Sequence, residues 1–144
     1  RAKSIIGIGT LLLDGLGDTI RVSLTENPEQ EIPVCYNILQ ASGRRITKTE
    51  FISCPSCGRT QYNIEKVEKE IKKRFSSLKG VKIAIMGCAV NGPGEMADAD
   101  FGYVGGASGK INLYYKQSLI KANIPEAFAL NELENLIKSK ISAT

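Results

Sequence analysis

The sequence predicts a mixed α/β protein in two parts, and two observations support this prediction. Residues 1–43 alternate helical and extended patterns in the order helix, strand, helix, as in a repeating βα protein. After the charged stretch 43–50, the pattern changes to several short strands and two amphipathic helices. We therefore expect one unit over residues 1–43 and a second α/β or α+β unit of about a hundred residues over 44–144.

The first unit is predicted to contain a short buried helix, one strand and a second helix. Residues 4–13 are mostly apolar and stop at a glycine-rich stretch, which is typical of a helix end. Residues 18–24 alternate apolar and polar side chains in the two-residue period of a strand. Asn27 and Pro28 are suited to begin the second helix, which we expect to end at residues 42–43. Its apolar positions recur at helical spacing: Ile32, Cys35, Tyr36 and Leu39.

One strand between two helices cannot form a parallel sheet by itself. We therefore expect the first unit to be the end of a longer repeating protein whose preceding elements lie upstream. Without those elements, apolar side chains should remain uncovered, and we expect them to be Ile5, Ile8, Leu12, Ile20 and Val22.

The second unit is predicted to open with a short strand over residues 50–53. Asn63 then caps a helix that ends near residues 79–80, with apolar positions three to four residues apart: Ile64, Val67, Ile71 and Phe75. The nearly continuous apolar run 81–86 indicates an interior strand.

The remainder of the second unit is predicted to contain three more strands and a closing helix. The strands are expected at residues 100–104, 110–115 and 119–123, separated by glycine-rich or short polar turns. Pro125 begins the last helix, whose predicted apolar positions are Phe128, Leu130, Leu133, Leu136 and Ile137.

Composition excludes several classes of protein. The 144 residues are 42% hydrophobic and 24% charged, which is enough apolar side chain for a core without disulfides. The formal charge of +4 is too small and too dispersed for a nucleic-acid surface. Neither a secretory leader nor a membrane-spanning run is present, so we expect a cytoplasmic protein, or a stromal one in a plastid-bearing cell. Because the sequence has no His, metal binding must rely on Cys, carboxylate and backbone groups.

Three of the four cysteines form a candidate metal site. Cys54 and Cys57 form a C-x-x-C motif, whose spacing lets two thiolates bind one metal or one face of a cluster. Cys88 follows the predicted interior strand, in a glycine-rich loop. The trio favours an iron–sulfur cluster; zinc is the next interpretation, followed by a redox dithiol or structural thiols. Cys35 is assigned to packing because it lies at helical spacing among apolar residues.

Four polar residues are candidates for a role beside the cysteines. Glu95 lies in the same loop as Cys88 and could supply an exchangeable oxygen ligand to a fourth iron, or it is a solvated carboxylate. Asn91 either faces a ligand or simply favours a tight turn. Arg21 and Ser23 share one face of the predicted strand, where they either hold a phosphate oxygen or lie on a solvated surface.

Four blocks of the sequence resemble one enzyme family in order and spacing. They are Lys3-Ser4 with Gly7, residues 11–24, the run Cys-Pro-Ser-Cys-Gly-Arg at 54–59, and residues 86–95 ending in Asn-Gly-Pro-Gly-Glu. They resemble the C-terminal part of the 4-hydroxy-3-methylbut-2-enyl diphosphate synthases, iron–sulfur oxidoreductases of isoprenoid biosynthesis by the methylerythritol phosphate pathway.

The resemblance implies a cofactor, a reaction and a set of site residues. A [4Fe–4S] cluster is implied with four ligands: Cys54, Cys57, Cys88 and Glu95. Asn91 and Glu95 are implied as catalytic, and Arg21 and Ser23 as contacts to the substrate diphosphate. The implied reaction is the two-electron reductive ring opening of 2-C-methyl-D-erythritol 2,4-cyclodiphosphate to 4-hydroxy-3-methylbut-2-enyl diphosphate, with electrons from ferredoxin or flavodoxin.

The resemblance also implies an architecture. Residues 1–43 match the last helix, strand and helix of a (β/α)₈ (TIM) barrel, and residues 44–144 match a cluster domain like that of sulfite and nitrite reductases. The full-length protein is implied to be a homodimer that contacts neither nucleic acid nor membrane. Because most of the barrel lies outside these residues, we expect the chain to be inactive alone. Two alternatives remain: a small iron–sulfur electron-transfer module and a zinc-stabilised interaction module.

Overall fold

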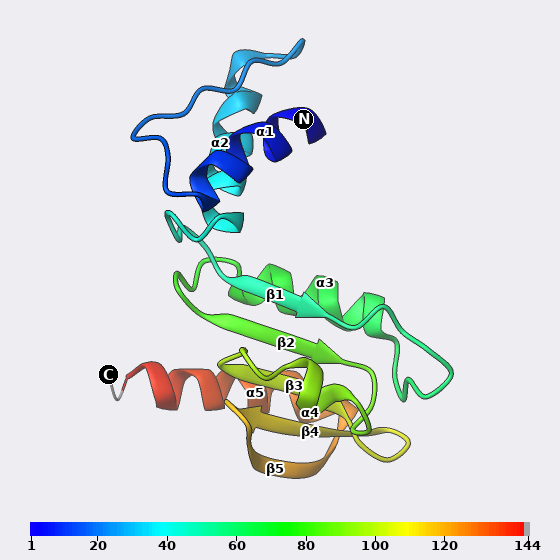
Figure 1. Ribbon diagram of the computed structural model, residues 1–144. Helices are drawn as coiled ribbons and strands as arrows, with labels where there is room; N and C mark the ends of the chain where they lie inside the picture. Colours follow the sequence, from blue (N-terminus) through cyan, green and yellow to red (C-terminus); the bar gives the residue numbers. More distant parts are fainter. Residues whose placement is uncertain (143–144) are drawn as a thin grey trace. The chain divides into compact units, whose positions relative to one another are not determined.

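The computed structural model describes residues 1–142 and divides the chain into two compact units (Figure 1). The first comprises Arg1–Thr47, and the second begins at Lys48. This division lies within the charged stretch 43–50. Each unit has its own hydrophobic core, and each is described by itself.

The first unit consists of α1 (Ala2–Leu13), the 3₁₀ helix η1 (Pro28–Gln30) and α2 (Glu31–Ala41). Its core is small and has four buried members: Leu12, Val22, Val34 and Ile38. The prediction of a buried first helix is wrong, because Leu12 is the only fully buried residue that α1 contributes. Ile6 and Leu13 on the same helix are 69% and 70% exposed, since too few elements surround α1 to cover them.

The predicted strand over residues 18–24 is not formed, although its alternating pattern has a clear effect on packing. The segment has no regular secondary structure, because a strand requires a hydrogen-bonded neighbour and this unit supplies none. Val22 is nevertheless buried, while Arg21 and Ser23 are exposed. The backbone N–H of Leu24 donates instead to the carboxylate of Glu31, at 3.0 Å.

The second helix of this unit begins and ends where the sequence predicts. The Asn27 side chain caps η1, and the chain leaves α2 through Ser42 and Gly43. The buried face of α2 differs from the predicted one, since Val34 and Ile38 are its buried residues. Ile32, which we expected on the apolar face, is 59% exposed. The expectation that Leu12 and Val22 are exposed is also wrong, because the exposed fraction of each is only 2%.

The second unit is built on one five-stranded sheet in the order β1-β2-β3-β4-β5. The strands are β1 (Glu50–Ser53), β2 (Lys82–Met86), β3 (Phe101–Gly105), β4 (Lys110–Tyr115) and β5 (Ser118–Pro125). The first three strands pair in parallel, and the last three pair antiparallel. All five predicted strands are confirmed, and β2 is an interior strand, as its apolar run indicates.

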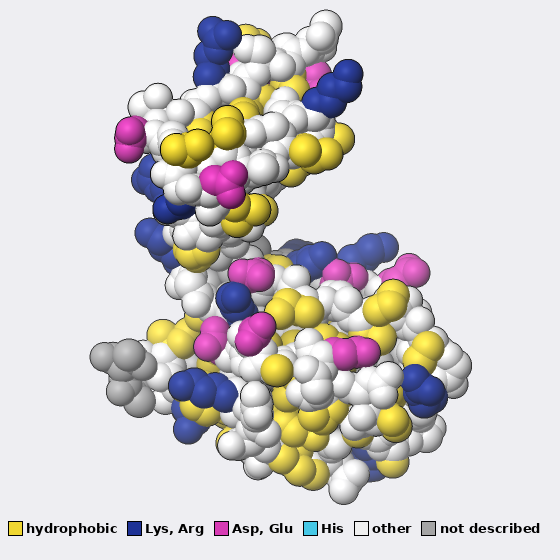
Figure 2. Space-filling view, viewed as in Figure 1, with side chains coloured by type: hydrophobic (Ala, Val, Ile, Leu, Met, Phe, Trp, Pro, Cys, Tyr) yellow, Lys and Arg dark blue, Asp and Glu magenta, His cyan; other side chains and the backbone are white. Residues whose placement is uncertain are grey.

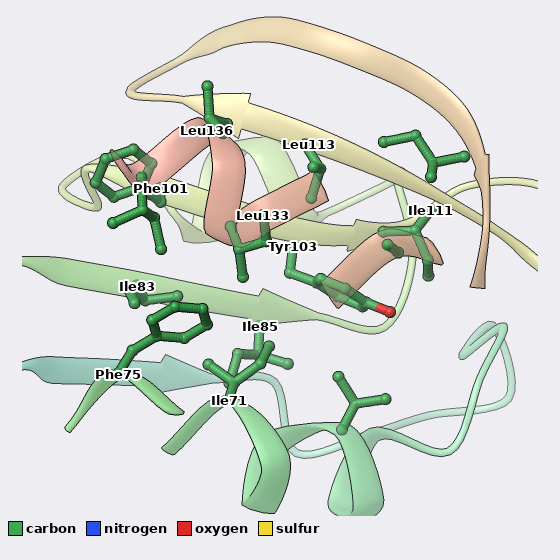
Figure 3. Packing of buried hydrophobic residues seen from close by; sticks show 14 of the residues in the cluster. Ile71, Phe75, Ile83, Ile85, Phe101, Tyr103, Ile111, Leu113, Leu133 and Leu136 are labelled. Atoms are coloured by element: carbon green, nitrogen blue, oxygen red, sulfur yellow. The ribbon is translucent and has the colours of Figure 1, made fainter. Parts of the chain in front are cut away.

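Three helices complete the second unit: α3 (Ile64–Phe75), α4 (Gly92–Glu95) and α5 (Glu126–Ile141). Helices α3 and α5 contribute to the main core together with one face of the sheet, where Ile83 and Ile85 of β2 are fully buried (Figure 3). The alternate residues of β2, Ala84 and Met86, belong to a second cluster on the other face, which Met96 beside α4 covers. The strict alternation along β2 therefore shows that both faces of the sheet are buried.

Two details of these helices differ from the predictions. Helix α3 ends at Phe75 rather than near residues 79–80, although all four predicted apolar positions are buried. Phe128 of α5 is 62% exposed, and the helix packs through Ala129, Leu133 and two further residues, Leu136 and Ile137.

Surface charge is mixed in sign. On the face drawn in Figure 2, Lys and Arg side chains alternate with Asp and Glu side chains on both units, and hydrophobic side chains lie between them. Within residues 1–142, none of the helices has the length and apolar character needed to cross a membrane.

Candidate metal centre

Parallel pairing brings the cysteine-bearing loops together. Strands β1 and β2 end at the same edge of the sheet, because Ser53 lies opposite Ile85 in the register. Cys54 directly follows β1, and its backbone N–H donates to the carbonyl of Ile85 at 3.0 Å. Cys88 follows β2 after a single intervening glycine. The carboxyl ends of the two strands thus deliver both loops to one place, as in other sheets with parallel strands.

A pocket of about 120 Å³ lies at this edge of the sheet. Its walls include six residues with chemically active side chains: Cys54, Cys57, Arg59, Cys88, Asn91 and Glu95. Five of the six are the site residues that the sequence analysis named in this unit. The structure therefore brings the predicted thiols, amide and carboxylate to a single pocket.

The remaining predicted site residues belong to the first unit. Arg21 and Ser23 are both exposed there, and Arg21 lines an apolar pocket of about 350 Å³ together with Tyr36 and Arg45. Cys35 packs against the small core of that unit, as its helical spacing predicts.

The C-x-x-C turn is held by a threonine that the sequence analysis did not single out. The hydroxyl oxygen of Thr60 accepts hydrogen bonds from the backbone N–H of Cys57, at 3.0 Å, and from the hydroxyl of Ser56, at 3.1 Å. The Thr60 backbone N–H donates in turn to the Cys57 carbonyl, at 3.0 Å. One side chain thereby fixes the backbone between the two thiols, including Ser56, whose φ is +70°.

The same segment is locked onto the end of β2. The Tyr62 hydroxyl donates to the carbonyl of Met86 at 3.0 Å. A Cβ atom on Gly87 would lie 2.6 Å from the Thr60 hydroxyl, and one on Gly105 would lie 2.2 Å from the Gly87 carbonyl. Only glycine fits at these two close approaches, so the glycines after β2 and at the end of β3 let the two cysteine loops meet. They are the one sequence signal that could have pointed to this contact.

The loop after β2 favours a thiolate at Cys88. The backbone N–H groups of Asn91 and Val90 donate toward its sulfur and hold its pKa below the usual value, with a smaller contribution from the nearby Arg59 side chain. Burial of the thiol acts in the opposite direction and is outweighed. Because the thiolate is the form that binds metals, this loop is prepared for a metal ligand. Its first turn closes by a bond from the Gly92 N–H to the Cys88 carbonyl, at 3.2 Å.

The donor set of the pocket fits an iron–sulfur cluster. Three thiols and one carboxylate are available, and Glu95 and Cys57 are exposed and free to approach a ligand. Within residues 1–142, the structure contains no group of three or more Cys, Asp or Glu side chains gathered around a single point, as one ion would require. In a [4Fe–4S] cluster each ligand binds a different iron, so its ligands lie farther apart than those of one ion.

Comparisons with known proteins agree with both units. The family model described as GcpE protein C-terminal domain matches residues 50–139, and the one described as GcpE TIM-barrel domain matches residues 1–36. The chain also matches relatives named 4-hydroxy-3-methylbut-2-en-1-yl diphosphate synthase (ferredoxin). The relative from Prochlorococcus marinus subsp. pastoris is 62% identical over 138 residues, which cover 96% of this chain and 34% of that protein.

Two further relatives with the same name agree with this result. Those from Picosynechococcus sp. and Trichodesmium erythraeum are 59% and 60% identical over 139 residues, again 96% of this chain and 34% of each protein. The chain therefore spans about a third of the length of the curated relatives it matches. Since the C-terminal domain model alone matches more than half of the chain, the chain belongs to the GcpE family.

Proposed function

We propose that this chain is the cluster-bearing part of a 4-hydroxy-3-methylbut-2-enyl diphosphate synthase. The observation that carries the proposal is the single pocket lined by Cys54, Cys57, Cys88 and Glu95 at the carboxyl ends of β1 and β2. These four residues are the proposed ligands of a [4Fe–4S] cluster. The names of the relatives support both the product and ferredoxin as the electron donor, and flavodoxin is the alternative donor.

The proposed reaction is the two-electron reductive ring opening of 2-C-methyl-D-erythritol 2,4-cyclodiphosphate. When bound, the cluster supplies the electrons for this reaction. The three thiolates hold it, and the exposed carboxylate of Glu95 is the exchangeable ligand that leaves room for a substrate oxygen. Asn91 is also exposed at the pocket, and its proposed role is to face the substrate. Arg21 and Ser23 are the proposed diphosphate contacts in the first unit.

The proposal extends to the whole enzyme. The first unit is the end of a (β/α)₈ barrel, and the second is a cluster domain of the kind found in sulfite and nitrite reductases. The full-length protein is a homodimer that acts in the cytoplasm or the plastid stroma. Because most of the barrel lies outside these residues, the chain should bind the cluster without turning over substrate.

Anaerobic reconstitution of the 144-residue chain tests the cofactor. The expected product is a brown protein with four irons and four acid-labile sulfides per chain. Cys54→Ser, Cys57→Ser and Cys88→Ser should each abolish or strongly weaken cluster binding. Cys35→Ala is the matched control and should bind normally, because Cys35 packs in the first unit. A colourless protein with one zinc per chain would contradict the proposal.

A further inference from the structure

Arg59 is the only cationic side chain among the residues that line the cysteine pocket. It follows Cys57 by two positions, and the backbone at this point is fixed by a hydrogen bond from the Gln61 side-chain amide to the Arg59 carbonyl, at 2.8 Å. The side chain is exposed. The protein thus places one positive charge at the rim of its most chemically active pocket.

No carboxylate neutralises this charge. Within residues 1–142, Arg59 makes no ion pair, whereas Arg1 and Arg74 pair with Glu26 and Glu134. The guanidinium instead lines the same 120 Å³ pocket as the thiol of Cys88, the most buried of the three pocket cysteines. A free guanidinium beside a metal-binding thiol has a direct electrostatic consequence.

That consequence concerns the reduction of a bound cluster. Adding one electron from a low-potential donor makes the cluster and its thiolates more negative by one charge, and no bond is broken. A nearby cation stabilises the more negative form more than the less negative one, and a hydrogen bond to a ligand sulfur acts in the same direction. Such contacts around the ligands are a general means of tuning metal sites.

We propose that Arg59 is a positioning residue that holds a positive charge beside the cysteine ligands of this pocket and thereby makes the bound cluster easier to reduce. This inference rests on the proposed function, because it requires the cluster. It assigns to Arg59 a role in the electron-accepting step, separate from the ligands and from the residues proposed to contact substrate.

The test is a redox titration of the reconstituted 144-residue chain, followed by electron paramagnetic resonance of the reduced cluster. Arg59→Gln removes the charge, and Arg59→Lys keeps it. Arg74→Gln is the matched control, since it removes the same charge from the last turn of α3, at the end opposite the pocket. We expect Arg59→Gln to shift the one-electron equilibrium by up to about tenfold toward the oxidised cluster, which is a 59 mV lower midpoint.

The remaining variants make the result specific. Arg59→Lys should restore most of the potential, and Arg74→Gln should match the unmodified chain. Loss of the cluster from Arg59→Gln but not from Arg59→Lys would overturn the proposal, because the charge would then be needed for cluster assembly rather than for reduction. Loss from both variants would overturn it, since lysine supplies the same charge.

Failure of the proposed function and failure of the role of Arg59 give different experimental results. If the unmodified chain does not assemble an iron–sulfur cluster, the proposed function is wrong. If the cluster assembles and all variants share one midpoint potential, the proposed function stands and the role of Arg59 is overturned. The guanidinium would then serve an anion outside the chain, such as a substrate phosphate or an acidic electron donor, and its loss would alter the kinetics of those steps alone.

Discussion

Ser56 adopts a φ of +70°, a left-handed conformation that costs a residue with a side chain about 1–2 kcal/mol and glycine almost nothing. The hydrogen bonds to the Thr60 hydroxyl keep Ser56 in this strained conformation. Ser56→Gly and Ser56→Ala both remove the hydroxyl that donates to Thr60, but only glycine also relieves the strain. We expect the glycine variant to be more stable than the alanine variant by about 1 kcal/mol in urea unfolding. Equal stabilities would show that Ser56 is not strained.

Tyr62 and Tyr103 form an edge-to-face pair with ring centroids 5.4 Å apart, but their hydroxyl groups differ. The Tyr62 hydroxyl donates to the Met86 carbonyl, whereas the buried Tyr103 hydroxyl has no hydrogen-bond partner in the part of the chain that is described. Burial raises the pKa of both phenols above the ordinary value. Each hydroxyl therefore stays protonated at neutral pH.

The difference predicts opposite effects of the same substitution. Tyr62→Phe should lower the free energy of unfolding by about 1 kcal/mol, because it breaks a bond that holds the cysteine segment to β2. Tyr103→Phe should leave it unchanged or raise it, because it removes an unsatisfied buried group. Chemical denaturation of the two variants gives the comparison directly. A destabilised Tyr103→Phe would indicate a partner for that hydroxyl, such as a buried water.

Variants of Glu95 should affect the assembly of the cluster and the turnover of substrate differently. If its carboxylate is a replaceable ligand, Glu95→Ala should still assemble a cluster on three thiolates, with a shorter lifetime in oxygen. Glu95→Cys should give a more persistent cluster, because a thiolate is softer and less exchangeable than a carboxylate. In the full-length enzyme both variants should turn over poorly. Electron paramagnetic resonance spectra identical for the unmodified chain and Glu95→Ala, with turnover unchanged, would show that Glu95 is a solvated residue and would favour an electron-transfer module.

At the residue scale, the sequence names the candidate ligands and misses the residues that hold their loops in place. The cysteines, Asn91 and Glu95 were named from motif and spacing, because their chemistry is visible in the residue type. Thr60 was not named, although it lies three residues after Cys57 and holds the C-x-x-C turn by local hydrogen bonds. Tyr62 was not named because its role is a contact with Met86 at the end of β2, more than twenty residues away along the chain. Such a contact depends on the strand register, which the sequence does not reveal in advance.

At the scale of elements, prediction succeeded where the chain contains both partners of a contact. The five strands and the buried face of α3 were found because the periodic side chains pack against one another within the second unit. The strand predicted over residues 18–24 does not form because the first unit contains no strand that could pair with it. Helix α1 is exposed because too few elements of this unit pack against it. The prediction that Phe128 is buried is wrong for a local reason, since α5 turns Ala129 rather than the larger Phe128 toward the core.

The junction between β1 and α3 gives a pH-dependent prediction at this scale. Glu68 of α3 pairs with Lys72 at 2.6 Å and accepts a hydrogen bond from Ser53, the last residue of β1, at 2.9 Å. The hydrogen bonds from these two residues hold the pKa of Glu68 below its usual value, and the contribution of Lys72 is the larger. A lowered folded-state pKa stabilises the protein above the unfolded-state pKa, and this stabilisation is lost as the pH falls through the folded-state pKa.

Glu68→Gln should therefore lower the free energy of unfolding at neutral pH by less than about 1 kcal/mol, since the pair is partly solvated. The difference between the two proteins should shrink progressively below about pH 4.3, the ordinary value for a glutamate. Urea unfolding at pH 7 and pH 3 measures it. A difference that persists unchanged at pH 3 would show that the side-chain amide, rather than the lost charge, is responsible.

At the scale of the whole molecule, the second unit buries its own core, whereas the first leaves apolar side chains in solvent. Five large hydrophobic residues of α1 and the segment that follows it are 45% to 70% exposed: Ile5, Ile6, Leu11, Leu13 and Leu16. Part of this surface forms a groove of about 220 Å³ between α1 and α2. The relatives are about three times as long as the chain, and the barrel domain model matches residues 1–36. The barrel remnant proposed above would account for a surface of this kind.

This surface should make the 144-residue chain self-associate, because covering each exposed Ile or Leu contributes about 1.5–3 kcal/mol. Ile6 and Leu13 both line the groove and are separated by two helical turns, so they lie on one face of α1. We expect Ile6→Glu with Leu13→Glu to weaken association at least about tenfold in sedimentation velocity. Phe128→Glu is the matched control, since Phe128 is 62% exposed but belongs to the second unit. A monodisperse monomer at high concentration would show that these side chains are covered in solution, and hence that the first unit folds differently.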